Sequence, residues 1–442
     1  MPDRLNSRIL AVCPDAASVF LMLESRSTEV FWLDAGIDAV EGWSFIGTGT
    51  RSTFPHHVAL DVAAAESAVP PFCDGWIGWL DYETGAAAAG APVASSERMD
   101  GAWLRATRIL AIDHASQQAW AISSADDLEA WAAEVSARTD APDRAASAAS
   151  SFDRNEMRRD AVSRHEPAEY IALIEECREL IRAGTAYQLC LTTRFTVEGS
   201  HNAADVYLRL RAATPAHHGG FVRIGDRSLL SASPEQFLHA SQGTVRTRPI
   251  KGTRPRSTDP VEDAALAAEL ATNSKERAEN VMIVDLMRND LSRVCEPGSI
   301  RVEGLWVVES YPAVHQLVST VSGALAKGVT VGELLAATFP AGSMTGAPKL
   351  SAMTRLYERE GGARGIYAGC FGYIGVDGSL DLAMVIRSIV IEPTRAVVGA
   401  GGGITWGSVA AAEVAEVTTK ARAPLAALGA ELPASWGSDI LN

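Results

Sequence analysis

Residues 365–392, GIYAGCFGYIGVDGSLDLAMVIRSIVIE, carry the clearest fold signal in the chain. Two stretches with alternating apolar residues flank Asp377-Gly378, a dipeptide that favours the tight turns of β-hairpins. The segment therefore predicts two antiparallel strands joined by a short turn.

Outward from this hairpin, the pattern predicts helices interspersed with further strands. After Pro167, apolar residues recur every three or four positions as far as Gly184, which indicates an amphipathic helix, and residues 187–197 follow as a strand. A second long helix is expected from about Asp259 to Arg288, and the residues ATNS at 271–274 are where it can break. Strands and helices do not alternate steadily, so the pattern favours an antiparallel α+β fold over a doubly wound sheet.

Composition divides the chain into three regions. Residues 1–135 mix short apolar runs with Gly and Pro breaks and are expected to be rich in strands. Residues 136–166 are rich in Ala, Ser, Asp and Arg and have little apolar periodicity, which predicts a linker or exposed excursion. Residues 167–428 hold the motifs that carry chemistry and form the expected catalytic domain.

The overall charge and the cysteines restrict the class of function. A formal net charge of -15 argues against a nucleic-acid partner, because binding to phosphates depends on clustered Lys and Arg. No run of 18 or more apolar residues occurs, and no signal peptide is evident, so neither membrane insertion nor export is expected. The six cysteines form no C-x-x-C pair, which fits a reducing cytoplasm. We therefore expect a cytoplasmic protein with a small-molecule substrate.

Two segments place paired glutamates three residues apart on expected helices. These are Glu276 with Glu279 in SKERAEN, and Glu413 with Glu416 in AAAEVAEVTTKA. Residues three apart lie on one helical face, and four carboxylates around one small volume suit a hard divalent cation, with Mg²⁺ the natural candidate. The alternative is that each pair is a solvated helix face with Lys or Arg partners, and that reading holds for most isolated E-x-x-E pairs.

Other motifs decide between a metal site and a solvated helix face. They are SASPE (231–235), RPIKGTRPR (248–256), RAENVMIVDLMRNDLSRV (277–294), VHQLVSTVSG (314–323), FPAGSMTGAPK (339–349), LAMVIRS (382–388) and GAGGGI (399–404). In this order and spacing they resemble the chorismate-utilising enzymes, which include anthranilate, aminodeoxychorismate, isochorismate and salicylate synthases. The resemblance covers about residues 165–425. It implies an antiparallel α+β fold in which sheets pack face to face under surrounding helices.

The resemblance also implies roles for individual residues. Glu279 and Glu416 match the direct Mg²⁺ ligands, with Glu276 and Glu413 beside them, acting through water. Glu235 matches the general acid that protonates the departing 4-hydroxyl of chorismate, and His315 matches a histidine that lines the pocket. Substrate-binding positions are implied for Arg387 and Tyr367, which would hold the enolpyruvyl carboxylate, and for Gln188, Gly252, Thr253, Ser343, Gly401, Gly403 and Lys420. Thr345 and Lys349 are further candidates of lower rank.

Lys251 in PIKGT separates the branches of this family. Anthranilate synthases carry a small residue at this position, whereas a lysine resembles the aminodeoxychorismate synthases, in which the amine attacks the ring at its 2-position. Gln188 stands where the water-adding members have a lysine base, which disfavours water as the nucleophile. The alternatives are an anthranilate synthase, which releases pyruvate, and a non-catalytic homologue that only binds chorismate.

The source of nitrogen is the last expectation. No cysteine lies in a G-x-C-x-G nucleophile elbow, so the chain is not expected to hydrolyse glutamine itself. By resemblance, a separate glutamine amidotransferase subunit would deliver ammonia. The product would be 4-amino-4-deoxychorismate, a precursor of 4-aminobenzoate and folate.

Overall fold

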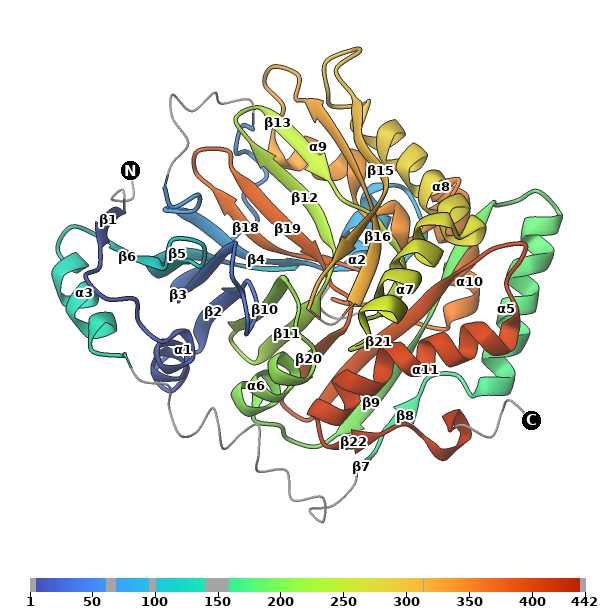
Figure 1. The fold of residues 1–442 in the computed structure, drawn as a ribbon, viewed down its shortest axis with the longest axis horizontal. Helices are drawn as coiled ribbons and strands as arrows, with labels where there is room; N and C mark the ends of the chain where they lie inside the picture. The colour runs from blue at the N-terminus through green and yellow to red at the C-terminus, as the bar shows by residue number, and fades with distance from the viewer. Residues whose placement is uncertain (1–4, 61–68, 95–100, 140–158, 313, 438–442) are drawn as a thin grey trace.

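The antiparallel α+β fold predicted from the sequence is confirmed. The structure is a computed structural model that describes residues 5–60, 69–94, 101–139, 159–312 and 314–437. Twenty of its strands form one hydrogen-bonded network with antiparallel pairings, and two short strands pair in parallel apart from it (Figure 1).

The strands are β1 (Asn6–Ile9), β2 (Glu29–Asp34), β3 (Trp43–Ser52), β4 (Gly75–Leu80), β5 (Ala102–Asp113), β6 (Gln118–Ser123), β7 (Arg159–Asp160), β8 (Val162–Ser163), β9 (Gln188–Glu198), β10 (His218–Ile224), β11 (Arg227–Ser233), β12 (Gln236–Ser241), β13 (Thr244–Thr247), β14 (Ile250–Pro255), β15 (Arg301–Ser310), β16 (Val314–Ala324), β17 (Gly346–Ala347), β18 (Cys370–Gly375), β19 (Leu380–Met384), β20 (Ser388–Glu392), β21 (Arg395–Ile404) and β22 (Ala430–Glu431). The helices are α1 (Ala16–Glu24), α2 (Tyr82–Ala88), α3 (Leu128–Ser136), α5 (Pro167–Arg182), α6 (Ala203–Ala213), α7 (Pro260–Thr272), α8 (Ser274–Leu291), α9 (Val331–Thr338), α10 (Lys349–Glu360) and α11 (Ala410–Ala427), with the 3₁₀ turns η1 (Gly342–Met344) and η2 (Ala434–Trp436).

The predicted hairpin is formed by β18 and β19, which pair antiparallel across the turn at Asp377-Gly378. Its outer edges pair with β4 and β12, so the hairpin lies inside the network. The second arm is shorter than its apolar run suggests, because Arg387 adopts φ +51° and separates β19 from β20.

The two predicted helices are present, with one break. The first is α5, and Gly184 after it has φ +74°, a conformation that favours glycine at a helix end. The second is divided into α7 and α8 at Asn273, whose side chain accepts a hydrogen bond from Glu276 N at 3.1 Å. The break therefore occurs within ATNS, because Asn273 caps the new helix more favourably than it would continue the old one.

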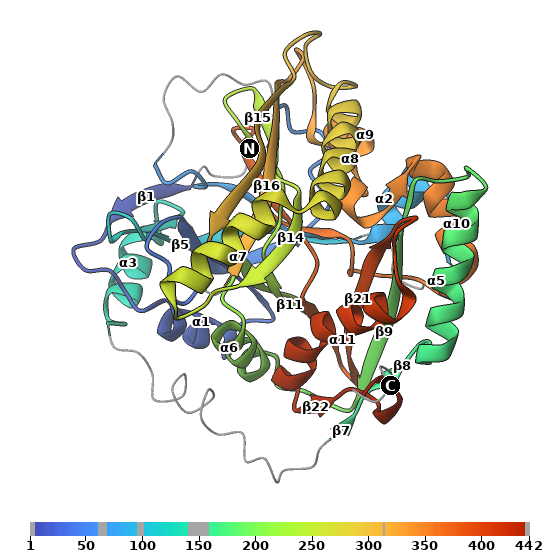
Figure 2. The ribbon, with the colours of Figure 1, turned by 45° about the vertical axis from the view of Figure 1, so that its right-hand side comes forward.

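An inner apolar core lies between facing parts of the strand network. The alternation along β2 shows this, since Phe31 and Leu33 enter the inner core while Val30 and Trp32 enter the cluster beneath the helices. Figures 1 and 2 show α7 and α8 over β14 to β16, and α11 beside β21 and β9. Two of these helices, α8 and α11, carry the predicted metal-binding carboxylates.

The N-terminal region contributes strands to the same network. Strand β2 pairs with β10, and β4 pairs with β18, so residues 1–135 and the expected catalytic domain share one sheet. Most of the predicted linker, residues 140–158, lies outside the described residues. The six cysteines, all within the described residues, form no disulfide with one another. No helix in the described part of the chain combines the length and hydropathy needed to cross a bilayer.

Candidate active site

The two glutamate pairs predicted to bind metal approach one another from α8 and α11. Lys275 joins them, with its Nζ 3.8 Å from Glu279 Oε1 and 3.9 Å from Glu413 Oε1. A Cβ placed on Gly402 would lie 3.1 Å from Glu413 Oε2 and 4.0 Å from Glu416 Oε1, so both glutamates of α11 face the glycine run of β21. The two helix faces therefore lie close to one another.

The carboxylates form an open arrangement, with no tight set of three donors among the described residues. Burial, together with the neighbouring carboxylates, raises the pKa of Glu279 and of Glu413. Lys275 is about half exposed, and its ammonium lies between Glu279 and Glu413. Oxygen donors that are partly buried and repel one another suit a hard divalent cation, so the residues fit Mg²⁺ once the exposed lysine moves aside.

The side chains of Gln188 and Lys251 both lie beside Gly403, in the glycine run of β21. A Cβ on Gly403 would lie 2.4 Å from Gln188 Nε2 and 3.5 Å from Lys251 Nζ, which explains why only glycine fits there. Gln188 is fully buried, and neither polar atom of its amide has a hydrogen-bond partner within the described residues. A buried amide without a partner is costly, so Gln188 is prepared to bind a further polar group.

Neighbouring charges act on the pKa of Lys251. A nucleophilic amine needs a lowered pKa, and burial acts in that direction, but Glu279, Cys190, Glu235 and Glu416 together raise the pKa of Lys251 above its usual value. The reason is the electrostatic attraction between these groups and the ammonium, which outweighs the effect of desolvation. A divalent cation among them would remove much of this effect.

Glu235 lies near Lys251, and its pKa is perturbed. The group formed by Lys251, Gln188, Glu235 and Ser343 is called the pocket below. Its carboxylate is buried and accepts a hydrogen bond from Ser343 Oγ at 3.0 Å. Burial raises the pKa of Glu235 to about 7, while Lys251, Ser343 and Lys420 oppose the rise. A carboxyl group poised near neutral pH can donate a proton, as the predicted general acid must.

Arg387 and Tyr367 are positioned by unusual backbone features. Arg387 has φ +51°, and within the described residues its guanidinium has neither a side-chain hydrogen bond nor an ion pair. Burial lowers its pKa, against the opposing effects of Tyr367 and Glu416. A Cβ on Gly399 would lie 2.1 Å from Tyr367 Cγ, so the ring packs directly on a glycine. A strained, unpaired guanidinium beside a tyrosine is suited to binding a carboxylate.

The remaining predicted substrate-binding residues lie on β14, β21 and α11. Gly252 has φ +81° and contacts the Glu276 side chain, and Thr253 is opposite Gln316 on β16. Gly401 accepts a hydrogen bond from Lys420 Nζ at 2.7 Å, and the same ammonium pairs with Glu416 at 2.6 Å. Lys420 is thus linked to both the glycine run and a predicted metal ligand.

Two predicted residues have other partners. His315 bonds through Nδ1 to Ser310 Oγ at 2.8 Å and through Nε2 to Asp263 Oδ1 at 2.9 Å, so both ring nitrogens are occupied. Lys349 pairs with Asp290 at 2.6 Å, and this ion pair connects α10 to α8. A role for His315 in the pocket stays a prediction, because its present contacts connect β16 to α7.

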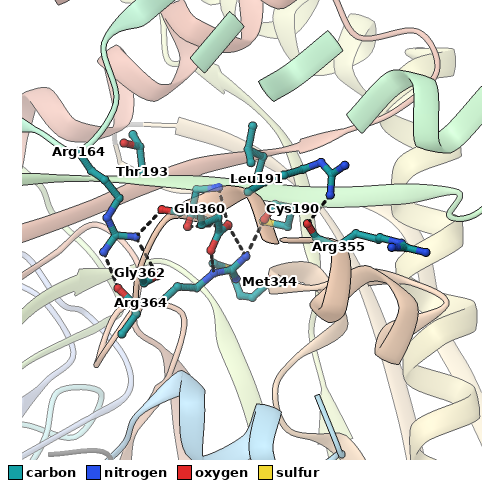
Figure 3. Close-up of polar contacts among 12 residues, drawn as sticks. Arg164, Cys190, Leu191, Thr193, Met344, Arg355, Glu360, Gly362 and Arg364 are labelled. Carbon is teal, nitrogen blue, oxygen red and sulfur yellow. Dashed lines mark hydrogen bonds and ion pairs between the residues drawn. The ribbon is translucent and has the colours of Figure 1, made fainter. Parts of the chain in front are cut away.

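Sequence reasoning missed a buried ion pair next to the pocket, formed by Arg364 and Glu360 (Figure 3). The available signal was weak: an arginine immediately before the G-x-Y element at 365–367. Its contacts depend on segments distant in the sequence, so spacing alone does not reveal them.

With this geometry in place, comparison with known proteins defines the class. Residues 28–426 match the family model of chorismate binding enzymes, and the chain belongs to that family.

The relatives within this class carry two different names. The chain is 37% identical to an aminodeoxychorismate synthase of Streptomyces pristinaespiralis, with 96% of this chain and 65% of the relative covered. It is also 37% identical to an anthranilate synthase component 1 of Streptomyces coelicolor, over 84% of this chain and 76% of the relative. The crystal structure of anthranilate synthase component I from Streptococcus pneumoniae superposes with a TM-score of 0.72 at 30% identity, covering 96% of this chain and 92% of that chain. The chain thus spans just under two thirds of the first relative.

Proposed function

We propose that this chain is the chorismate-aminating component of an aminodeoxychorismate synthase, which converts chorismate and ammonia to 4-amino-4-deoxychorismate and water. The observation that carries the proposal is the position of the partly buried Lys251 close to Glu235, Gln188 and the carboxylates of two helices. The name of the Streptomyces pristinaespiralis relative supports it. Lys251 distinguishes this pocket from that of an anthranilate synthase.

The residues support a two-step displacement. The amine of Lys251, after losing its proton, attacks the ring at carbon 2, both ring double bonds shift, and the 4-hydroxyl leaves as water with the proton of Glu235. The new secondary ammonium returns a proton to Glu235. Ammonia then attacks carbon 4, both double bonds shift back, the bond between carbon 2 and the lysine nitrogen breaks, and the lysine amine leaves with a proton from the new ammonium group. Arg387 and Tyr367 hold the enolpyruvyl carboxylate during both steps.

Glu279 and Glu416, with Glu276 and Glu413 beside them, would hold Mg²⁺. The ion would supply positive charge for the ring carboxylate and reduce its repulsion from the glutamates. Lys275, which lies between the helix faces in this structure, would turn toward solvent.

A coupled assay tests the proposal against anthranilate synthesis. The purified chain is incubated with chorismate, Mg²⁺ and ammonium, and pyruvate is followed with lactate dehydrogenase. We expect chorismate to be consumed without pyruvate release, because 4-amination leaves the enolpyruvyl group in place. Stoichiometric pyruvate would instead show the 2-aminating reaction named for the Streptomyces coelicolor relative. Binding of chorismate without turnover would favour a non-catalytic role.

The nitrogen source gives a second prediction. Because the sequence shows no amidotransferase nucleophile elbow, the chain alone should form product from ammonium and not from glutamine. We propose that a separate glutamine amidotransferase subunit supplies ammonia, and that adding it restores use of glutamine. Glutaminase activity of the chain alone, measured by glutamate release, would contradict this prediction.

The pKa of Glu235 leads to a pH prediction. A general acid must be protonated, so the rate should fall as the pH rises through about 7, where the carboxyl group loses its proton. The Ser343 hydroxyl stabilises the ionised form, so Ser343→Ala should raise the pKa of Glu235 and move the alkaline limb of the pH-rate profile to higher pH. An alkaline limb that stays in place in Ser343→Ala would remove Glu235 from the proton transfer.

A further inference from the structure

The buried ion pair of Arg364 and Glu360 is unusually complete. Arg364 Nε donates to Glu360 Oε2 at 2.8 Å, and Nη2 donates to Glu360 Oε1 at 2.7 Å (Figure 3). The side chains are 1% and 5% exposed, and the guanidinium lies 4.2 Å above the Tyr82 ring. This planar fork is fixed in one orientation, which a lysine could not reproduce.

The rest of the guanidinium joins two segments that are far apart in the sequence. Nη1 donates to the carbonyl of Met344 in η1 at 2.6 Å, and Nη2 donates to the carbonyl of Cys190 in β9 at 2.8 Å. The backbone connects the same segments directly, since Cys190 N donates to the carbonyl of Thr345 at 2.8 Å. Arg364 therefore holds η1 against β9.

Each of these segments carries a side chain of the pocket. Ser343, next to Met344, donates the hydrogen bond to Glu235. Gln188 precedes Cys190 by two residues on β9 and lies beside Lys251. A shift of either carbonyl by an ångström would move one of these groups relative to the reacting atoms.

Glu360, the ion-pair partner of Arg364, also forms hydrogen bonds with β9. Glu360 Oε1 accepts hydrogen bonds from the backbone N and from Oγ1 of Thr192, each at 2.9 Å. On the other side, Glu83 of α2 accepts from the backbone N of Arg364 at 2.7 Å and of Gly365 at 2.9 Å. Residues of the N-terminal region and of α10 thus fix the arginine from both sides.

We propose that Arg364, paired with Glu360, is a positioning residue that sets Ser343 and Gln188 in place relative to Glu235 and Lys251. The inference rests on the proposed amination of chorismate. Arg364 acts through the carbonyls of Met344 and Cys190, and its role is to keep the acid and the lysine aligned.

The test compares two arginines that contact the same segment, residues 360–365. Arg364→Lys keeps a positive charge for Glu360 and loses the fork, and kcat with ammonium should fall roughly 10- to 100-fold, with KM for chorismate changing much less. The matched control is Arg164→Lys. The Arg164 guanidinium donates to the carbonyls of Glu360, Gly362 and Ala363 (Figure 3), and no bond from it to η1 or β9 occurs among the described residues, so its variant should keep kcat even if its melting temperature falls. The backbone N–H of residue 164, which the substitution leaves in place, donates to the carbonyl of Arg194 in β9 at 2.8 Å.

A double-mutant cycle separates positioning from general destabilisation. Arg364 is proposed to act on Glu235 through Ser343. The loss of kcat in the double variant Arg364→Lys/Ser343→Ala should therefore be smaller than the product of the losses in the two single variants. Arg364→Lys should also move the alkaline limb of the pH-rate profile in the same direction as Ser343→Ala. Independent effects of the two substitutions on kcat would overturn the inference.

Folding is checked by circular dichroism and thermal melting. If Arg364→Lys does not fold, the paired variant Glu360→Gln/Arg364→Gln, which buries no unpaired charge, takes its place in the same measurements. A folded variant with kcat within about twofold of the parent would overturn the inference. If the parent releases pyruvate from chorismate, the proposed function fails, and the same kcat comparison on the 2-amino product still decides whether Arg364 positions the site.

Discussion

Lys251→Ala should lower the rate of 4-amino-4-deoxychorismate formation by at least about 10³-fold, since removing a covalent nucleophile costs several orders of magnitude in other enzymes. Chorismate should still bind, because the proposed carboxylate clamp of Arg387 and Tyr367 is unchanged. The rate is measured with ammonium and saturating Mg²⁺, and binding by calorimetry. Small amounts of a 2-aminated product are expected, because ammonia can then reach carbon 2 directly.

Two controls isolate the amine from its charge. Lys251→Arg keeps a cation and is not a nucleophile at this pH, so it should be as inactive as Lys251→Ala. Lys327→Ala makes the same change at an exposed lysine and should leave the rate unchanged. Full 4-amination by Lys251→Ala would exclude the lysine as nucleophile.

Glu279→Gln and Glu416→Gln should each lower activity more than about 100-fold, because the loss of a ligand charge removes several kcal/mol of electrostatic stabilisation. Folding should be retained, because at Glu279 a neutral amide relieves repulsion among the carboxylates, and at Glu416 it removes only a partly exposed ion pair with Lys420. Activity as a function of Mg²⁺ concentration measures the effect, and any residual activity should require higher concentrations.

The control is Asp285→Asn, at a carboxylate of α8 whose side chain is 78% exposed and paired with Arg288. This variant should keep the Mg²⁺ dependence of the parent, since the substitution lies on the solvent side of the same helix. Full activity of the parent in excess chelator would remove the metal from the mechanism.

Local patterns predicted the elements that depend on nearby residues. The turn at Asp377-Gly378 and the break at Asn273 follow from local turn and capping chemistry, and both are present. The E-x-x-E spacing placed two carboxylates on one face of each helix. That the faces of α8 and α11 meet depends on the whole fold, and the resemblance to a known family supplied that information.

Contacts between distant segments could not be predicted in this way. Arg364 joins carbonyls of residues 190 and 344, and nothing in the spacing of these positions indicates it. The partners of Lys349 and His315 are likewise set by the packing of α8 and α7. The raised pKa of Lys251 results from carboxylates of three separate segments, so its direction also required the three-dimensional arrangement.

The position of the new carbon–nitrogen bond tests the central claim most directly. The chain is incubated with chorismate, Mg²⁺ and ¹⁵N-labelled ammonium, and the product is examined by NMR and mass spectrometry. The account predicts ¹⁵N bonded to carbon 4 of a product that keeps its enolpyruvyl group. A product with ¹⁵N on carbon 2, accompanied by free pyruvate, would contradict it.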